Sequence, residues 1–229
     1  VHGSDSEDNA IVTTVDERTG IWEVYAWKIS IEGELLWGQD GVVVTNSGLT
    51  NMSPRISVLS DNSVIVSCTQ DDSKVFIQRI SSEGLMLWEN GILLEHDNNS
   101  MISPQSVKYS DNSFLIQWIG QAPGWPIYSE IYLQKYSLNG EPIWIEPSTV
   151  VESTIFPMGN WAQQLVVKQG YGSFSAWTQF LGNAQNAVSH SLHTSVYDGY
   201  KKGTGDQHHN KLAKHLGMGD MNKPGNSDQ

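Results

Sequence analysis

Short runs of apolar and β-branched residues recur along this chain, each opened by a polar turn pair. The runs lie at residues 10–15, 63–68 and 113–118, after Asp-Asn pairs at 8–9, 61–62 and 111–112. Short Asp and Asn side chains bond to the neighbouring backbone and tolerate turn conformations, whereas β-branched and aromatic residues favour strands. The pattern therefore predicts a strand that begins after each pair.

A second recurring element is a glycine that stands four residues ahead of a tryptophan. The pairs are Gly33 with Trp37, Gly84 with Trp88, and Gly140 with Trp144. We expect each glycine to adopt a positive φ in the hairpin turn between a third and a fourth strand. We expect each tryptophan to pack between neighbouring units, because burial of a large apolar ring is strongly stabilising.

These elements repeat at a spacing of about fifty residues, which is typical of propeller blades with four short antiparallel strands. Pro54 and Pro104 stand at equivalent places, and each is expected to be the first residue of a strand because proline lacks an amide donor. The sequence predicts an all-β fold, a β-propeller-type array of about four four-stranded blades. The predicted units are residues 8–47, 48–98, 99–152 and 153–200.

The two ends of the chain differ from the repeats. Residues 1–7 are polar and acidic without a period, and they are predicted to be a disordered N-terminal segment. Residues 201–229 contain no tryptophan, phenylalanine, valine or isoleucine and are predicted to be a polar, mostly disordered tail. The first and last units each show three strands. We therefore expect an incomplete propeller, or one completed by further blades or by another chain.

The composition excludes several classes of partner. The chain has 13 Lys and Arg against 25 Asp and Glu, a net charge of −12, so no nucleic-acid partner is expected. No run of eighteen apolar residues is present, so no membrane span is predicted. The chain begins with Val1 rather than methionine, which favours a processed product or part of a longer chain.

No catalytic constellation is found, and the chain is predicted not to be an enzyme. Cys68, the single cysteine, lies in an apolar strand and is expected to be structural. The pairs Asp16-Glu17 and Asp71-Asp72 stand in equivalent loops, where a calcium site or a glycosidase pair is the alternative to solvated turn formers. His208, His209 and His215 lie in a segment rich in Gly and Lys. Neither a cofactor nor a metal site is predicted.

The additional residues of the third unit fall in the loop at residues 120–129. Trp125 stands between two prolines in this loop, and Tyr128 follows it. Exposed aromatic rings bind sugars or partner proteins, so Trp125 and Tyr128 are candidate binding residues. The alternative is that the ring of Trp125 folds back over the edge of the blade.

The repeats resemble the propeller-like repeats of large secreted bacterial surface proteins. The motifs are those of residues 33–42, 77–80 and 131–136, and the resemblance covers residues 8 to 200. It implies a secreted, periplasmic or cell-surface protein without an assigned activity. More distantly, the spacing of glycine and tryptophan is similar to that of quinoprotein-type blades, although the threonine of that motif is missing here.

The favoured function is therefore an exported, non-enzymatic scaffold or surface-interaction module. It is expected to bind a protein or glycan partner through loops between strands. The alternatives are a carbohydrate-binding propeller and a non-catalytic fragment of a hydrolase or quinoprotein.

Overall fold

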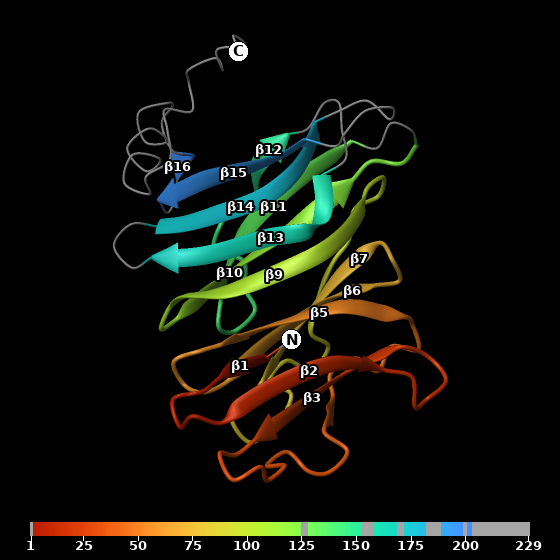
Figure 1. Ribbon diagram of the computed structural model, residues 1–229, viewed down its shortest axis with the longest axis vertical. Helices are drawn as coiled ribbons and strands as arrows, with labels where there is room; N and C mark the ends of the chain where they lie inside the picture. The colour runs from red at the N-terminus through yellow and green to blue at the C-terminus, as the bar shows by residue number, and fades with distance from the viewer. Residues whose placement is uncertain are drawn as a thin grey trace.

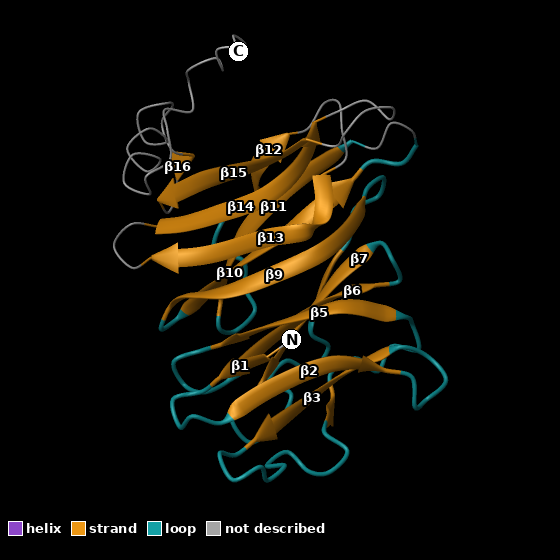
Figure 2. Ribbon diagram, in the orientation of Figure 1, coloured by secondary structure: helices purple, strands orange, loops and turns teal. Residues whose placement is uncertain are grey.

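A computed structural model of the protein describes residues 2–124, 128–152, 158–168, 172–181, 189–198 and 201–202. Within these residues every regular element is a β-strand (Figure 2). The sixteen strands form four antiparallel sheets of four strands each. The predicted all-β class is confirmed.

The strands of each sheet are as follows. Sheet 1 contains β1 (His2–Ser4), β2 (Ala10–Asp16), β3 (Glu23–Ile29) and β4 (Val42–Val43). Sheet 2 contains β5 (Asn51–Val58), β6 (Val64–Gln70), β7 (Lys74–Ile80) and β8 (Ile92–Leu94). Sheet 3 contains β9 (Ser100–Ser110), β10 (Ser113–Gln121), β11 (Ser129–Ser137) and β12 (Ser148–Glu152). Sheet 4 contains β13 (Met158–Lys168), β14 (Gly172–Leu181), β15 (Ser189–Asp198) and β16 (Lys201–Lys202).

In every sheet the strands are neighbours in the order in which they occur along the chain. Such up-and-down order needs only short hairpin connections, which the turn residues supply. Figure 1 shows the sheets following one another from sheet 1 at the bottom to sheet 4 at the top. The first strands of successive sheets are packed together, β1 on β5, β5 on β9 and β9 on β13. The first strands therefore lie side by side along the array.

The alternating strand direction sorts the connections onto two faces. We call the end with the first-to-second and third-to-fourth turns the hairpin face. The described first-to-second turns are residues 5–9, 59–63 and 111–112. The turns that open the third-to-fourth connections are at residues 30–34, 81–85 and 137–141. We call the opposite end the linker face; its described residues are 17–22, 44–50, 71–73, 95–99, 122–124 and 128. The linker face carries the second-to-third connections and the linkers between sheets.

The third-to-fourth connection has the same geometry in sheets 1, 2 and 3. Gly33 N donates to Ser30 O (3.0 Å), and Ser30 N donates to Glu34 O (2.9 Å). Equivalent pairs of bonds occur at Ser81 and Ser137. This is a type I turn followed by a residue with positive φ, here Gly33, Gly84 and Gly140 at φ 87°, 89° and 87°.

Three apolar clusters lie between adjacent sheets. In the first, Ile11 and Val24 of sheet 1 pack against Val64 and Val66 of sheet 2. These four residues are fully buried, so this part of the junction between sheets 1 and 2 is closed to solvent.

The other two clusters follow the same plan. Ile65 and Ile77 of sheet 2 join Phe114 of sheet 3 in the second cluster. Leu133 of sheet 3 joins Leu165 of sheet 4 in the third. Sheets 2 and 3 each contribute to two clusters, and these middle sheets therefore bury both of their faces.

The tryptophans of the repeat lie at these same junctions. Trp37 belongs to the cluster between sheets 1 and 2 and donates Nε1–H to Ser82 O of sheet 2 (3.0 Å). Trp88 packs in the next cluster and donates to Leu138 O of sheet 3 (3.2 Å). Trp144 lies in the cluster that includes Leu165 of sheet 4.

A turn glycine of the next sheet receives each of the first two rings. A Cβ added to Gly84 would lie 3.0 Å from the ring of Trp37, and one added to Gly140 would lie 3.4 Å from that of Trp88. Gly84 also has positive φ, so two separate constraints favour glycine there. At Gly140 a contact of 3.4 Å is ordinary, and the positive φ alone favours glycine.

The N-terminal segment differs from the prediction of disorder over residues 1–7. His2–Ser4 form β1, which pairs with β2 at Gly3↔Ile11 and gives sheet 1 four strands. A Cβ at Gly3 would lie 3.3 Å from Val58 of sheet 2, so the strand is packed as well as paired. Sheet 4 also has a short fourth strand, β16, within the segment predicted to be a tail; residues 203–229 lie outside the described residues.

Pro54 and Pro104 do not begin their strands as predicted. β5 begins at Asn51, and its register against β6 shifts between Met52 and Arg55. The Ser-Pro pair occupies this bulge, and Ser53 and Ser103 both have φ 53°. A bulge accommodates proline inside a strand because the ladder hydrogen bond is already interrupted there.

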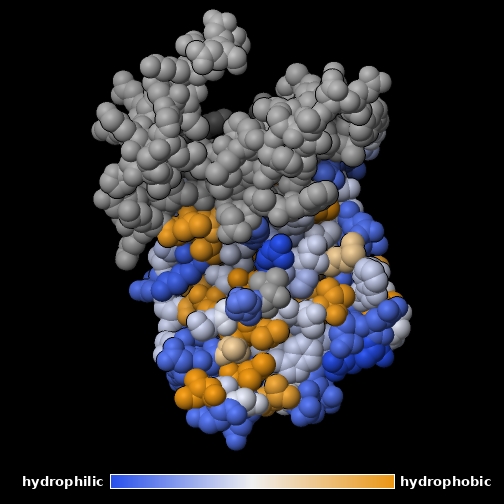
Figure 3. Space-filling model, in the orientation of Figure 1, coloured by the Kyte–Doolittle hydropathy of each residue, from blue (hydrophilic) through white to orange (hydrophobic). Residues whose placement is uncertain are grey.

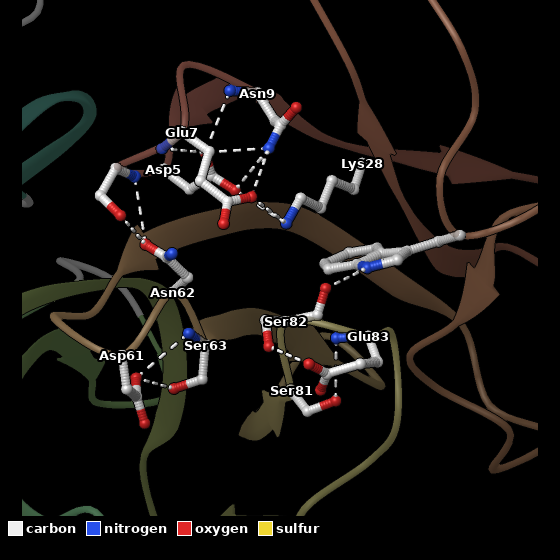
Figure 4. Close-up of polar contacts among 12 residues, drawn as sticks. Asp5, Glu7, Asn9, Lys28, Asp61, Asn62, Ser63, Ser81, Ser82 and Glu83 are labelled. Carbon is white, nitrogen blue, oxygen red and sulfur yellow. Dashed lines mark hydrogen bonds and ion pairs between the residues drawn. The ribbon is translucent and has the colours of Figure 1, made fainter.

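The hairpin face of sheet 1 holds a buried ion pair. The register places Asp5 where sheet 2 has the buried Leu59, because Asp5 N donates to Asn9 O as Leu59 N donates to Ser63 O. The side chain of Asp5 is 0% exposed and that of Lys28 is 7% exposed, with Lys28 Nζ 2.9 Å from Asp5 Oδ2. Figure 4 shows Asn9 and Glu7 completing this network beside Asn62 of sheet 2.

This network changes the ionisation of Asp5. Desolvation acts to raise its pKa, but hydrogen bonds from Lys28 and Asn9 outweigh desolvation and lower the pKa to about 2. Since the folded-state pKa is below the usual value of 3.8, the ionised carboxylate stabilises the fold above about pH 4. This contribution is lost as the pH falls from about 4 toward 2.

We predict that the Asp5–Lys28 ion pair makes a measurable contribution to the loss of unfolding free energy at acid pH. In the double variant Asp5→Leu/Lys28→Met, the pair is replaced by apolar side chains, which is often neutral at pH 7. Between pH 5 and pH 2 the wild type should lose about 2 kcal/mol more unfolding free energy than the double variant, measured by urea denaturation.

Asp40→Asn serves as the control, because the Asp40 side chain is 95% exposed. It should leave the acid dependence of the wild type unchanged. Equal acid dependence in the wild type and the double variant would contradict this role of Asp5.

Candidate binding site

A hollow of about 480 Å³ opens between sheets 1 and 2 at their linker-face end. It is lined by Val15, Glu17, Trp22, Met52 and Ser53. The first three come from the end of β2 and the loop that follows it, and the other two come from β5. The hollow is thus built from two sheets at their junction.

Trp22 is the aromatic side of this hollow. Its side chain is 44% exposed, whereas the tryptophans of the repeat, Trp37 and Trp144, are buried. An exposed indole offers a flat apolar surface and one N–H donor.

The Trp22 loop is hydrogen-bonded to Asn51, the first residue of β5 in sheet 2. The carbonyl oxygen of Trp22 accepts hydrogen bonds from Asn51 N (2.8 Å) and Asn51 Nδ2 (3.3 Å). Asn51 is fully buried, and its Nδ2 also donates to Leu49 O (2.6 Å). Gln70 Nε2 donates to Asn51 Oδ1 (3.1 Å). Asn51 therefore positions the backbone that carries the ring.

The junction of sheets 2 and 3 has the same backbone link but different side chains. Met101 N donates to Ser73 O (2.8 Å), as Asn51 N donates to Trp22 O, so Ser73 stands at the position of Trp22. Thr69 stands at the position of Val15, and its Oγ1 accepts a hydrogen bond from Ser103 N (3.0 Å). The aromatic wall is therefore particular to the first of these two junctions.

The serine φ values do not distinguish the two junctions. Ser53 and Ser103 both have φ 53°, a region that residues other than glycine seldom adopt. Because the conformation is shared, it belongs to the repeat and does not by itself mark a site.

Arg18 does not line the hollow, and its side chain is engaged by other residues of sheet 1. Its Nη2 lies 2.6 Å from Asp16 Oδ2, its Nη1 donates to Asp40 O (3.1 Å), and its guanidinium lies 4.2 Å from the ring centre of Tyr25. The hydrogen bond from Arg18 lowers the pKa of Asp16. Of the residues that line the hollow, Glu17 is the only one with an ionisable side chain.

The predicted binding residues lie in another loop of the linker face. Trp125 lies outside the described residues. Tyr128 is 43% exposed, and its carbonyl oxygen accepts a hydrogen bond from Ala122 N (2.9 Å). This bond closes the described base of the loop. The structure therefore places Tyr128 on the surface, apart from the five residues that line the hollow.

The other sequence candidates have simple surroundings. Burial raises the pKa of the Cys68 thiol to about 12, so the thiol is not a ready nucleophile. Asp71 and Asp72 form the tight β6–β7 turn, with φ 51° and 52°. No group of three His, Cys, Asp or Glu side chains suited to a metal ion occurs in the described residues. His208, His209 and His215 lie outside them. In that described part, no helix has the length and apolarity needed to cross a membrane.

The coloured part of the face shown in Figure 3, which is formed by described residues, has no large continuous apolar patch. Hydrophobic side chains there are interspersed with hydrophilic ones over sheets 1 and 2. A continuous apolar patch would have indicated a large protein interface. The hollow at the sheet junction is therefore the more specific feature.

Sequence reasoning missed Trp22 and Asn51, and it considered Glu17 only as half of the Asp16-Glu17 pair. A usable signal was the length of the β2–β3 connection, six residues at 17–22, against three at 71–73. The β10–β11 loop is longer still and drew attention to Trp125 instead. Only the fold shows that sheets 1 and 2 meet at Trp22.

Comparison with known proteins identifies a fold but no family. No protein-family profile matches the chain, and no curated protein sequence matches it. Among solved structures the chain is similar to an endo-arabinase from Bacteroides thetaiotaomicron, with a TM-score of 0.51 and 11% identity. The match covers 88% of this chain and 75% of that one. That enzyme has a β-propeller-type fold, and at this identity the likeness concerns the fold alone.

We predict that Asn51 controls the order of the Trp22 loop. Asn51→Ala removes the hydrogen bonds that the side-chain amide donates to Trp22 O and Leu49 O, which should cost about 1–3 kcal/mol of unfolding free energy. Hydrogen–deuterium exchange of residues 17–22 should become faster. Asn62→Ala, on the hairpin face, should leave exchange of this loop unchanged. Unaltered exchange in Asn51→Ala would contradict the positioning role.

Proposed function

We propose that this protein is a non-enzymatic surface-interaction module that holds a glycan on its linker face. The observation that carries the proposal is the hollow between sheets 1 and 2, with its exposed Trp22. Ligand sites are concave and combine an apolar wall with a few polar groups. Here Trp22, Val15 and Met52 supply the wall, and Glu17 and Ser53 supply the polar groups.

The scaffold around the hollow supports binding without large rearrangement. Sheets 1 and 2 are joined by a buried apolar cluster and by the Trp37–Ser82 hydrogen bond. Asn51 fixes the loop of Trp22 to the second sheet. A preformed site loses less conformational entropy when its ligand binds.

The likeness to an endo-arabinase favours a glycan over a protein as the ligand. The name of that enzyme indicates a carbohydrate substrate. The hollow of the present chain contains an exposed tryptophan, and such rings stack against sugars. Hydrolysis is not part of the proposal. Glycosidases generally use two carboxyl groups, and Glu17 is the only carboxylate among the residues that line the hollow.

We also propose a more detailed architecture and a cellular location for the protein. The four sheets are regarded as blades of a propeller-type array that is incomplete or is completed by further blades or another chain. The repeated glycine and tryptophan motif, with its resemblance to secreted surface proteins, supports export to the periplasm or the cell surface.

We predict that Trp22→Ala weakens glycan binding by about 2 kcal/mol, or about 30-fold. The probes are debranched arabinan, xylan and galactan, cast separately into native gels in which binding retards the protein. Because Trp22 is already 44% exposed, the unfolding free energy should change by less than about 1 kcal/mol.

Leu87→Ala is the matched control, because Leu87 is 45% exposed and does not line the hollow. It should be retarded like the wild type. Trp125→Ala tests the second loop: loss of retardation in this variant, with Trp22→Ala unaffected, would move the site to residues 122–128. Absence of retardation of the wild type by every polysaccharide would overturn the proposed function.

A further inference from the structure

We infer that the hollow selects an uncharged sugar residue, stacked on Trp22 and hydrogen-bonded by Glu17, and that it excludes acidic glycans. This inference rests on the proposed function and narrows the class of ligand. It follows from the shape of the site, from the charges around it and from the contacts that engage Arg18.

The lining provides one apolar surface and one strong acceptor. The exposed Trp22 ring suits the C–H face of a sugar, and Met52 and Val15 extend the apolar surface. The carboxylate of Glu17 accepts hydrogen bonds only, and a sugar hydroxyl donates them. The hydroxyl of Ser53 can donate or accept a further bond.

The charge of the linker face opposes an acidic ligand. Its described residues include no lysine and one arginine, against the carboxylates of Glu17, Asp71, Asp72, Glu95 and Asp97. The lysine that follows this face in β7, Lys74, is paired with Glu95 at 2.9 Å. An anion near these carboxylates meets repulsion, and Arg18 is the one cation among the described residues of the linker face.

Arg18 is the cation that could have reversed this preference. It follows Glu17 directly, yet its guanidinium is bonded to Asp16 and lies over the ring of Tyr25, and neither of these residues lines the hollow. A site for uronate or sulfate groups would use such a guanidinium as a bidentate donor. In this structure the arginine is already engaged elsewhere.

Side chains at the linker face are described for two junctions, that of sheets 1 and 2 and that of sheets 2 and 3. Of these two, only the first combines an exposed indole with a carboxylate. At the second, Ser73 replaces the indole, and the hydroxyl of Thr69 is bonded to the Ser103 backbone. We therefore expect one such sugar site from sheets 1 to 3.

The test compares retardation of the full chain in gels containing neutral galactan, acidic polygalacturonate or cationic chitosan. Debranched arabinan and xylan are tried beside galactan as neutral polymers. We expect at least one neutral polymer to retard the protein and polygalacturonate not to retard it. Glu17→Gln should weaken neutral binding about tenfold, since it replaces a charged acceptor with a neutral one. Leu87→Ala remains the control.

The outcomes separate this inference from the proposed function. Retardation by polygalacturonate as strong as that by a neutral polymer would overturn the charge selection while glycan binding stands. Stronger retardation by chitosan, lost at about 0.5 M salt, where surface charges are strongly screened, would assign a cationic ligand and overturn the inference. No retardation in any gel would remove the proposed function itself. Unchanged binding by Glu17→Gln would exclude the role of Glu17.

Discussion

The structure depends on the burial of sheet faces against neighbouring sheets. A four-stranded sheet of short strands cannot cover its own two faces, so its apolar side chains must be buried by adjacent sheets. In sheet 2, Val64 and Val66 face sheet 1, while Ile65 and Ile77 face sheet 3. The alternation along β6 thus serves two interfaces at once. Every junction formed in this way has two ends, and the candidate site is at one of them.

The two ends of the first junction have different roles. At the hairpin face, the ring of Trp37 packs on Gly84, and its N–H is bonded to Ser82 O. Ser6 also donates to Asn62 Oδ1 there, which further joins the two sheets. At the linker face the longer β2–β3 loop holds Trp22 outward beside Met52 and Ser53. The closed end provides rigidity, and the open end provides the surface proposed to bind a glycan.

Much of this architecture could be predicted from local sequence signals. The turn glycines have the expected positive φ because the turn residue type and the backbone conformation are directly linked. Pro54 was placed wrongly because a bulge and a strand start satisfy proline in the same way. β1 was missed because its stability comes from pairing with β2 and packing on sheet 2, not from the composition of residues 1–7.

The site was less predictable than the fold. Trp22 and Ser53 are far apart in the sequence, and only the packing of sheet 1 on sheet 2 brings them to one hollow. In the sequence, Asn51 resembles any polar residue at the start of a strand, and its role is visible only from its bonds to Trp22 O and Leu49 O. Such sites depend on long-range geometry, for which a single sequence carries little local signal.

The central claim is that a neutral sugar binds against Trp22. The most direct measurement is ¹⁹F NMR of the full chain labelled with 5-fluorotryptophan, with the Trp22 resonance assigned from the spectrum of Trp22→Phe. Titration with a neutral oligosaccharide that binds in gels should shift the Trp22 resonance and leave those of the buried Trp37 and Trp144 in place. Saturable binding with an unshifted Trp22 resonance would contradict the account.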